Sequence, residues 1–286
     1  METLLASALF WQQIFTPVHH SAQKPVVRTT RERSYVPVRA TREERNMDFY
    51  RQHARKKPRT NLRLQKTHVV IAPHPDDEIL CCGAVLREAV ESGDRVKIIY
   101  LTDGDGLDHG SHGDARAYGF TRKKESITAA KFLGIPKSSL YFLGFPDGHL
   151  DDLDELGSVQ SSYTLQNKSS FSSHFPATPY TRKNLKNNLT KLLQKLRPDV
   201  VYLPSLTKDK HPDHQVSARF VREILAEKNM HPELKVYTVH GRRFWTQRSQ
   251  LDRKKLRLIR VFQSQFHDDY HMDFLERFAR YREVFD

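Results

Sequence analysis

The chain has 286 residues, a formal net charge of +13 and only two cysteines, which are adjacent at positions 81 and 82. Adjacent cysteines cannot join distant segments, so a small fold held together by disulfides is excluded. The hydrophobic share of 38% is low for a globular chain, which predicts one packed core together with a polar, less well packed portion.

The positive charge is concentrated near the N-terminus. Residues 24–66 carry a net charge of +10, whereas the rest of the chain carries +3. We therefore predict a basic N-terminal arm over residues 1–66, poorly packed or peripheral, followed by an α/β domain over residues 67–286. Segment 24–66 is suited to contact an anionic surface such as nucleic acid or a membrane, and a solvated tail is the alternative.

The first residues, METLLASALFWQQIFTPV, are apolar but shorter than the roughly 20 residues that span a bilayer. Glu2 stands where a secretory signal would carry a positive charge. The sequence thus favours a cytoplasmic location, with peripheral membrane association as an alternative and export left open.

Strand and helix patterns alternate from residue 67 onward. The first elements are a β-branched strand at 67–73, a helix at 78–92, a strand at 95–102, a helix at 122–133 and a strand at 139–145. They are followed by a helix at 183–196, a strand at 199–205, a helix at 216–229, a strand at 234–241 and a mostly helical end from Lys254. Polar loops are predicted at 103–119 and 151–182, the second as an insertion or lid. This alternation predicts an α/β fold, a Rossmann-like, mostly parallel sheet with helices on both faces.

Two of the predicted strands end in clusters of polar residues. APHPDDE, residues 72–78, follows the first strand, and KDKHPDHQ, residues 208–215, follows the fourth. Ligands of open α/β sheets bind outside the carboxyl ends of the strands, so both clusters can face one crevice.

The first cluster contains side chains that bind metals. His74 and Asp77 offer an imidazole and a carboxylate three residues apart, and Asp76 and Glu78 remain as spare carboxylates for a general base. Capping of a helix N-terminus is the alternative, but it accounts for one aspartate and not for the whole run.

The second cluster adds two imidazoles, His211 and His214. Either one would complete three protein ligands with His74 and Asp77 and leave a coordination position open, as in a catalytic Zn²⁺ site. Two histidines and one carboxylate would equally hold Fe²⁺. The sequence therefore predicts a metal site at the C-terminal strand ends.

The motifs and their order resemble the LmbE/PIG-L family of zinc-dependent de-N-acetylases, which includes the enzyme that deacetylates N-acetylglucosaminyl-phosphatidylinositol. The resemblance extends from about Thr67 to the C-terminus and includes TDGDG, RKKESITAAKFLG, LGFPDG and the SQ pair at 264–265. It implies that residues 67–286 form a catalytic domain that removes an N-acetyl group from an N-acetylglucosamine-containing substrate. Residues 1–66 have no counterpart in this resemblance.

The resemblance also implies a role for each matching residue. His74, Asp77 and His214 would be the metal ligands, and Asp76 would be the general base. A protonated His211 would help to stabilise the oxyanion. The residue that protonates the departing amine is left open between the base and His211.

Four further residues are candidates for substrate binding or for supporting roles. Asp213 is suited to orient a histidine through a hydrogen bond. Arg122 and Glu125 are expected at a helix start facing the site, where Arg122 would bind a sugar hydroxyl or phosphate; a surface ion pair is the alternative. Asp147 would either tune His211 or shape the PDG turn.

Two other function classes stay open on the residues alone. The basic arm would suit a nucleic-acid-binding protein, but it lacks regular aromatic interleaving. Histidine and aspartate clusters also serve metal-dependent phosphoesterases, but the apparent ligands suffice for only one metal. The sequence indicates no defined protein partner, and it does not identify the group attached to the amino sugar.

Overall fold

The computed structural model describes residues 64–106, 114–153, 157–169, 175–241, 251–265, 278–280, 283 and 285. The predicted basic arm therefore lies outside the described residues, apart from 64–66. Part of the predicted loop 103–119 also lies outside them.

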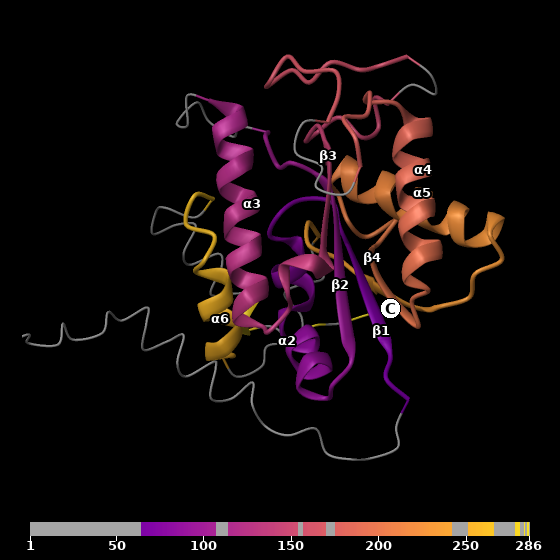
Figure 1. Cartoon of the computed structure of the whole chain (residues 1–286). Coiled ribbons are helices and arrows are strands. Elements are labelled where there is room, and N and C mark those ends of the chain that lie inside the picture. Colours follow the sequence, from indigo (N-terminus) through magenta and orange to yellow (C-terminus); the bar gives the residue numbers. More distant parts are fainter. Residues whose placement is uncertain are drawn as a thin grey trace, which may run out of the picture. The chain divides into compact units, whose positions relative to one another are not determined.

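A five-stranded parallel sheet forms the centre of the described fold (Figure 1). Its spatial order is β3-β2-β1-β4-β5, and the strands are β1 (Thr67–Ala72), β2 (Arg95–Thr102), β3 (Leu140–Phe145), β4 (Val200–Pro204) and β5 (Glu233–Tyr237). Val70 of β1 pairs with Ile98 of β2 on one side and with Tyr202 of β4 on the other. The chain first builds outward from β1 to β3 and then continues on the other side with β4 and β5. The order reverses between β1 and β4, which is where open α/β sheets bind their ligands.

Helices cover both faces of this sheet, as the sequence predicted. One face is covered by α2 (Asp77–Glu91), α3 (Ala115–Phe132) and α6 (Arg253–Ile259), and the other by α4 (Arg182–Leu196) and α5 (Pro212–Glu227) (Figure 1). A short 3-10 helix, η1 (Lys137–Ser139), leads into β3. Successive residues of a strand pack against opposite layers, since Val70 belongs to the core on the α2 side and Val69 and Ile71 to the core on the α4 side.

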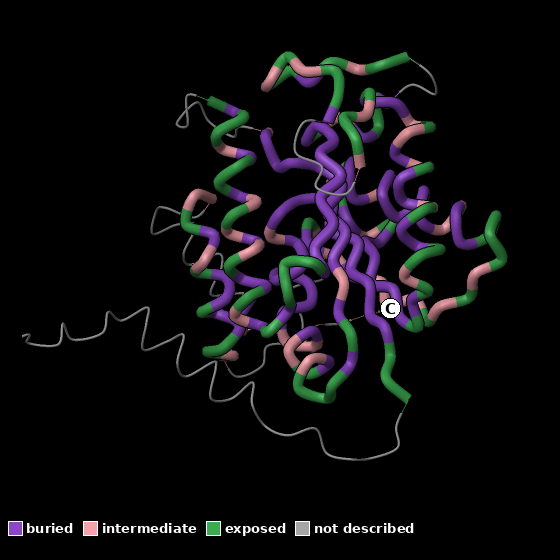
Figure 2. Tube along the Cα trace, viewed as in Figure 1, coloured by how far each residue is buried: buried purple, intermediate pink, exposed green. Residues whose placement is uncertain are grey.

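The strands are the most deeply buried part of the described chain, while the outer sides of α3 and α4 are exposed (Figure 2). Every residue of β1 is buried, which explains why the run THVVIA has no polar alternation. Burying an aliphatic side chain such as that of Ile71 contributes about 1.5–3 kcal/mol to stability. The loops at the strand ends are therefore carried by a rigid, closely packed sheet.

Two helices, α3 and α5, begin several residues earlier than the sequence predicted. α3 begins at Ala115, within the predicted loop, because the Asp114 carboxylate caps it by accepting from two backbone amides of its first turn. Gly119 indicates a loop in the sequence, but it lies inside the helix. Glycine suits this position because a side chain there would come within 3.1 Å of the Asp103 carbonyl oxygen. α5 begins at Pro212, since proline suits the first helical position.

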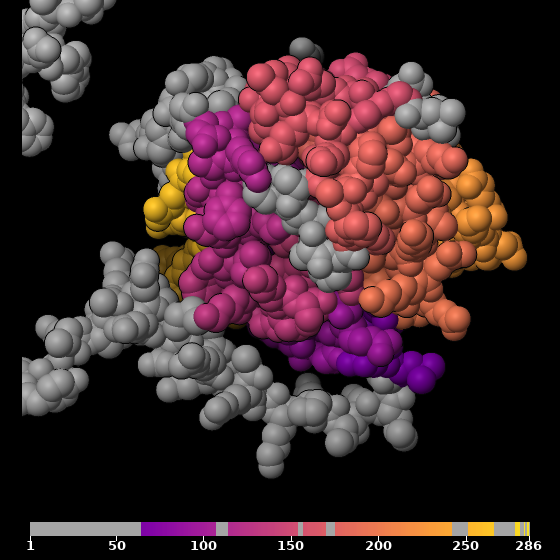
Figure 3. All heavy atoms as spheres, turned by 45° about the horizontal axis from the view of Figure 1, so that its top comes forward, coloured from indigo at the N-terminus to yellow at the C-terminus, as the bar shows by residue number. Residues whose placement is uncertain are grey.

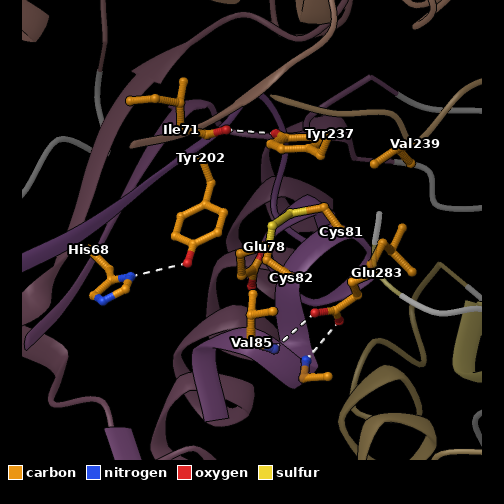
Figure 4. The surroundings of a disulfide bond; sticks show 12 residues. His68, Ile71, Glu78, Cys81, Cys82, Val85, Tyr202, Tyr237, Val239 and Glu283 are labelled. Atoms are coloured by element: carbon orange, nitrogen blue, oxygen red, sulfur yellow. Dashed lines mark hydrogen bonds between the residues drawn. A yellow bond between two sulfur atoms is a disulfide. The ribbon is translucent and has the colours of Figure 1, made fainter. Parts of the chain in front are cut away.

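The two cysteines lie inside α2, where Cys81 and Cys82 form a disulfide with each other (Figure 4). As expected for neighbours, this bond joins no distant segments. Close by, the Glu283 carboxylate accepts hydrogen bonds from two backbone amides of α2 and forms a 2.7 Å ion pair with the buried Lys255. The C-terminal end of the chain is thereby tied to the helix that starts at the polar strand end.

The segment between β3 and α4 has no helix in its described residues. It consists of turns and contains one antiparallel bridge, between Lys168 and Pro179. The space-filling view shows its described parts at the surface between α3 and α4 (Figure 3). This agrees with an insertion over 151–182, whereas a function as a lid stays a prediction. In the part of the chain that the structure describes, no helix is long and apolar enough to cross a membrane.

Candidate metal centre

His74, Asp77 and His214 meet at the carboxyl ends of β1 and β4. His74 follows β1, Asp77 is the first residue of α2, and His214 lies in the first turn of α5. His74 Nδ1 lies 3.3 Å from Asp77 Oδ2 and 3.2 Å from His214 Nε2, and His214 Nε2 lies 3.2 Å from Asp77 Oδ2. All three side chains are buried. Two imidazole nitrogens and one carboxylate oxygen thus form a nearly equilateral triangle.

This triangle has the size of one face of a tetrahedral metal site. Nitrogen and oxygen ligands lie about 2.0–2.1 Å from zinc, so two ligands of one tetrahedral ion are about 3.3–3.5 Å apart. The three observed separations of 3.2–3.3 Å are close to this value. The donor set also suits Fe²⁺, which accepts two histidines and one carboxylate. The residues present therefore fit a single catalytic metal ion.

Other candidate ligands surround the triangle. Ligand atoms lie within 4.8 Å of one another in His74–His211–His214, in Asp77–His214–His240 and in His74–Asp147–Asp213. Each of these groups contains His74 or His214, so they describe the surroundings of one centre. In the triangle of His74, Asp77 and His214, all three separations are 3.2–3.3 Å.

Neighbouring carboxylates raise the pKa values of the two histidines. Burial opposes protonation of His214, but Asp77 and Asp209 raise its pKa to about 9. Burial likewise opposes protonation of His74, and Asp147 outweighs it and raises this pKa well above 6.5. Burial alone would raise the pKa of Asp77, yet His214 and His74 hold it well below its ordinary value. The cluster is built to hold positive charge, which a metal ion supplies when it displaces the protons.

A carboxylate orients each candidate ligand histidine through its other ring nitrogen. Asp209 Oδ2 lies 3.1 Å from His214 Nδ1. Asp147 Oδ1 and Asp213 Oδ2 lie 2.9 Å and 3.1 Å from His74 Nε2. Such partners set the tautomer and the ring orientation of a metal-bound histidine. Asp213 thus contacts a histidine, and Asp147 contacts His74 where the sequence suggested His211.

Sequence reasoning missed Asp209. Its fully buried carboxylate accepts hydrogen bonds from the backbone amides of Val239 at 2.8 Å and His211 at 3.1 Å, in addition to its contact with His214. Burial would raise its pKa, but the hydrogen bond from His214 lowers the value to about 2. In the sequence, Asp209 is one polar residue within KDKHPDHQ, and nothing in the spacing distinguishes it. Only the fold brings the end of β5 to it.

Sequence reasoning also missed His240, which follows β5 at the same edge of the sheet. Its ring centroid lies 4.8 Å from that of His214 and 5.2 Å from that of His211. His240 is exposed, so it lies where the histidine cluster meets solvent. His240 belongs to no motif in the sequence. Its position after a predicted strand is the feature that could have indicated a place at the site.

Asp76 lies beside the triangle without belonging to it. Its carboxylate is largely buried, and its Oδ2 lies 3.5 Å from Arg122 Nη2. Burial raises the pKa of Asp76 to about 7, against the opposing charge of Arg122. A general base is most effective when its pKa is near the working pH. Asp76 therefore has the position and the acidity of a group that exchanges protons at the site.

Arg122 is buried in the middle of α3 and not at a helix start. Its guanidinium donates to the carbonyl oxygens of Gly104 and Pro75 at 3.0 Å and 3.2 Å, and its Nη1 lies 3.4 Å from Asp147 Oδ2. A side chain at Gly104 would come within 2.7 Å of this guanidinium. Arg122 therefore has internal partners that hold the loops after β1 and β2 and the PDG turn together.

Glu125 has different partners from Arg122, so the two do not form a surface pair. Its carboxylate accepts from the Ser264 backbone amide at 2.8 Å and from the Ser264 hydroxyl at 2.7 Å. The next residue, Gln265, donates to the Pro75 carbonyl oxygen at 3.0 Å. Glu125 thus anchors the SQ pair against the turn that carries Asp76.

His211 is the N-cap residue of α5, and its ring faces His74 with centroids 4.6 Å apart. Its Nδ1 accepts a hydrogen bond from the Asp213 backbone amide at 3.2 Å, which places the ring proton on Nε2. Burial, and then the charges of His74 and His214, lower its pKa. The accepting Nδ1 and the lowered pKa both favour the neutral ring with its proton on Nε2, whereas the sequence led us to expect a protonated His211.

Glu78 is fully buried on α2, and its Oε2 accepts a hydrogen bond from the Asp76 backbone amide at 2.9 Å. Burial, and then the charge of Asp76, raise its pKa to about 8. The Glu78 carboxyl, the other spare carboxylate of the motif, therefore binds the backbone of Asp76.

The chain resembles known proteins in sequence and in fold. The chain is 26% identical over 222 residues, 71% of this chain and 72% of the relative, to the diacetylchitobiose deacetylase of Thermococcus kodakarensis. The structure is similar to that of the N,N'-diacetylchitobiose deacetylase from Pyrococcus horikoshii, with a TM-score of 0.56 and 21% identity over 88% of this chain and 94% of that one. It is also similar to a conserved protein from Thermus thermophilus, TT1542, with a TM-score of 0.52 and 22% identity over 77% and 94% of the two chains.

At these identities the two structural likenesses show the fold alone. The family model for PIG-L, described as GlcNAc-PI de-N-acetylase, matches residues 69–225. This range contains both polar strand ends and covers more than half of the chain. The chain therefore belongs to the PIG-L family of de-N-acetylases.

Proposed function

We propose that this protein is a metal-dependent amidohydrolase that removes the N-acetyl group from an N-acetylglucosamine-containing substrate. The observation that carries the proposal is the triangle of His74, Asp77 and His214, with Asp76 beside it as a base. Membership of a de-N-acetylase family and the likeness to a diacetylchitobiose deacetylase support this class of substrate.

His74, Asp77 and His214 would hold the ion, and Zn²⁺ is the proposed metal, with Fe²⁺ as the alternative. When bound, such an ion polarises the amide carbonyl and lowers the pKa of water from about 15.7 to near 7. The three ligands contribute one negative charge in total, so a divalent ion together with these ligands would keep a net positive charge that favours an oxyanion.

Asp76 and His211 would act on the two sides of the amide. Asp76 accepts the proton of the attacking water, for which a pKa of about 7 is well suited. The neutral His211 donates from Nε2 to the carbonyl oxygen as negative charge develops there. Arg122 keeps Asp76 and Asp147 in place through its internal contacts.

The geometry also favours one source for the proton on the leaving amine. His211 Nδ1 is occupied by the Asp213 backbone amide, so a neutral His211 has no second proton to transfer. Asp76 gains a proton from water in the first step and would return it to the nitrogen. The bond from water oxygen to the acetyl carbon then replaces the carbon–nitrogen bond, which yields acetate and a free amine.

The test measures bound metal and amine release together. Wild-type protein should hold about one equivalent of zinc and release amine from N,N'-diacetylchitobiose or another N-acetylglucosamine derivative. His74→Ala and His214→Ala should each lose most of the metal and essentially all of the activity. His231→Ala is the control, because His231 is an exposed histidine at the opposite end of β5. A variant without either proposed ligand that kept metal and wild-type turnover would disprove the ligand set.

The same samples distinguish the other function classes. Release of phosphate from phosphate esters, without amine release, would favour a phosphoesterase. We also propose, from sequence alone, a cytoplasmic protein whose basic segment 24–66 contacts an anionic surface; salt-sensitive binding to anionic vesicles tests this contact.

A further inference from the structure

The backbone of Asp76 has an unusual conformation. Its φ is 147° and its ψ is −31°, and L-residues other than glycine rarely adopt this region. Strained residues persist only where the surroundings hold them, and they occur often at active sites. The surroundings of Asp76 must therefore include a group that stabilises this conformation.

The N-terminus of α2 lacks an ordinary cap. Asp76 is the N-cap residue, a position where an aspartate side chain usually accepts a hydrogen bond from the helix. Here its side chain makes no such bond. The Asp76 carboxylate is instead directed towards Arg122, with 3.5 Å between Oδ2 and Nη2. The strained backbone and the carboxylate that faces Arg122 and does not cap the helix are two aspects of one arrangement.

Glu78 supplies the contact that holds this arrangement. It lies on α2, one turn before the cysteine pair, and is fully buried (Figure 4). Its Oε2 accepts the Asp76 backbone N–H at 2.9 Å. The glutamate of a capping box makes the same kind of contact from the third helical position, whereas Glu78 makes it from the second. The reciprocal bond, in which the Asp76 carboxylate would accept from a backbone N–H of the first helical turn, is absent.

We propose that Glu78 is a positioning residue that holds the backbone of Asp76, so that the Asp76 carboxylate serves proton transfer and does not cap the helix. This inference rests on the proposed function, in which Asp76 is the base. It excludes Glu78 as a base, because its carboxyl is fully buried and used on the backbone of its neighbour.

The experiment is a double-mutant cycle with matched replacements. Glu78→Met removes the acceptor at similar volume, Glu78→Gln keeps an acceptor oxygen, and Glu88→Met makes the same change at an exposed position of α2. Glu78→Met should lower kcat on the order of 10–100-fold, with KM and zinc content close to wild type. Glu78→Gln should recover most of the rate, and Glu88→Met should change nothing. In an Asp76→Asn background, Glu78→Met should have little further effect on kcat.

A second measurement does not depend on activity. Amide hydrogen exchange at Asp76, followed by NMR, should be slow in wild type and Glu78→Gln and at least 10-fold faster in Glu78→Met. If Glu78→Met fails to fold, Glu78→Asp, which is too short to reach the amide, replaces it.

Three outcomes would overturn the proposal. They are an equal loss of kcat with and without the Asp76 carboxylate, a Glu78→Gln variant as slow as Glu78→Met, and unchanged exchange at the Asp76 amide. If the wild-type protein releases no amine, the proposed function fails, while the exchange measurement still decides whether Glu78 holds Asp76.

Discussion

The two strand ends that form the site are built in opposite ways. At the end of β1, His74, Asp76 and Asp77 share one tight turn whose central residue has a φ of 147°. At the end of β4, His211 has an ordinary extended backbone with a φ of −79°, and His214 lies on the regular helix that Pro212 starts. The first end contributes two candidate ligands and the proposed base, and the second contributes one candidate ligand and its orienting carboxylate. In the proposed function, metal binding would therefore depend on both ends, whereas proton transfer from water would depend on the first.

The largest effect is expected at the end of β1, where Asp76 and Asp77 are proposed to have different roles. Asp76→Asn keeps the shape but removes the basic site, so zinc content should stay near one equivalent while kcat falls about 10²–10⁴-fold. Asp77→Asn should instead lose metal and rate together. Zinc stoichiometry and the rate constant of amine release, measured on both variants, test this assignment. If the Asp76 variant lost its zinc and the Asp77 variant kept it, the two roles would be reversed.

The second prediction concerns the pH dependence of zinc binding, which involves His74 at the end of β1 and His214 after β4. His214, with a pKa of about 9, and His74, with a raised pKa, hold protons at neutral pH that must leave before a metal binds. The apparent zinc affinity should therefore rise with pH, by about 10- to 100-fold per unit for one to two released protons, until pH exceeds about 9. Calorimetric titrations in buffers of different ionisation enthalpy count these protons. An affinity independent of pH between 6 and 8 would rule out both histidines as ligands.

A smaller effect is expected at the second end alone. Asp209→Asn keeps the shape but removes the charge that orients His214, so zinc affinity should weaken about 10–100-fold. The kcat of the zinc-loaded variant should change less, because Asp209 does not contact Asp76. Competition with a chromophoric chelator measures the affinity, and Asp151→Asn provides an exposed control. An affinity equal to that of wild type would show that His214 needs no orienting carboxylate.

The α/β class, the family of de-N-acetylases and most strand and helix positions could be predicted from the sequence, although α3 begins seven residues before its predicted start. These follow from local signals, because apolar runs such as THVVIA and motifs such as HPDDE are contiguous in the chain. Its errors are local too: Gly119 suggested a loop, although the glycine is needed inside α3 for close packing against Asp103.

The partners of each site residue become visible only in the folded chain. Asp209 is joined to the end of β5, Arg122 is turned inward between two carboxylates, and the Nδ1 of His211 accepts from a backbone amide. No motif in the sequence indicates these contacts, because they form only when the sheet order β3-β2-β1-β4-β5 brings distant loops to one edge. The chain's residue types determine which chemistry is available, while burial and hydrogen bonding set the charge and orientation with which each group meets the substrate.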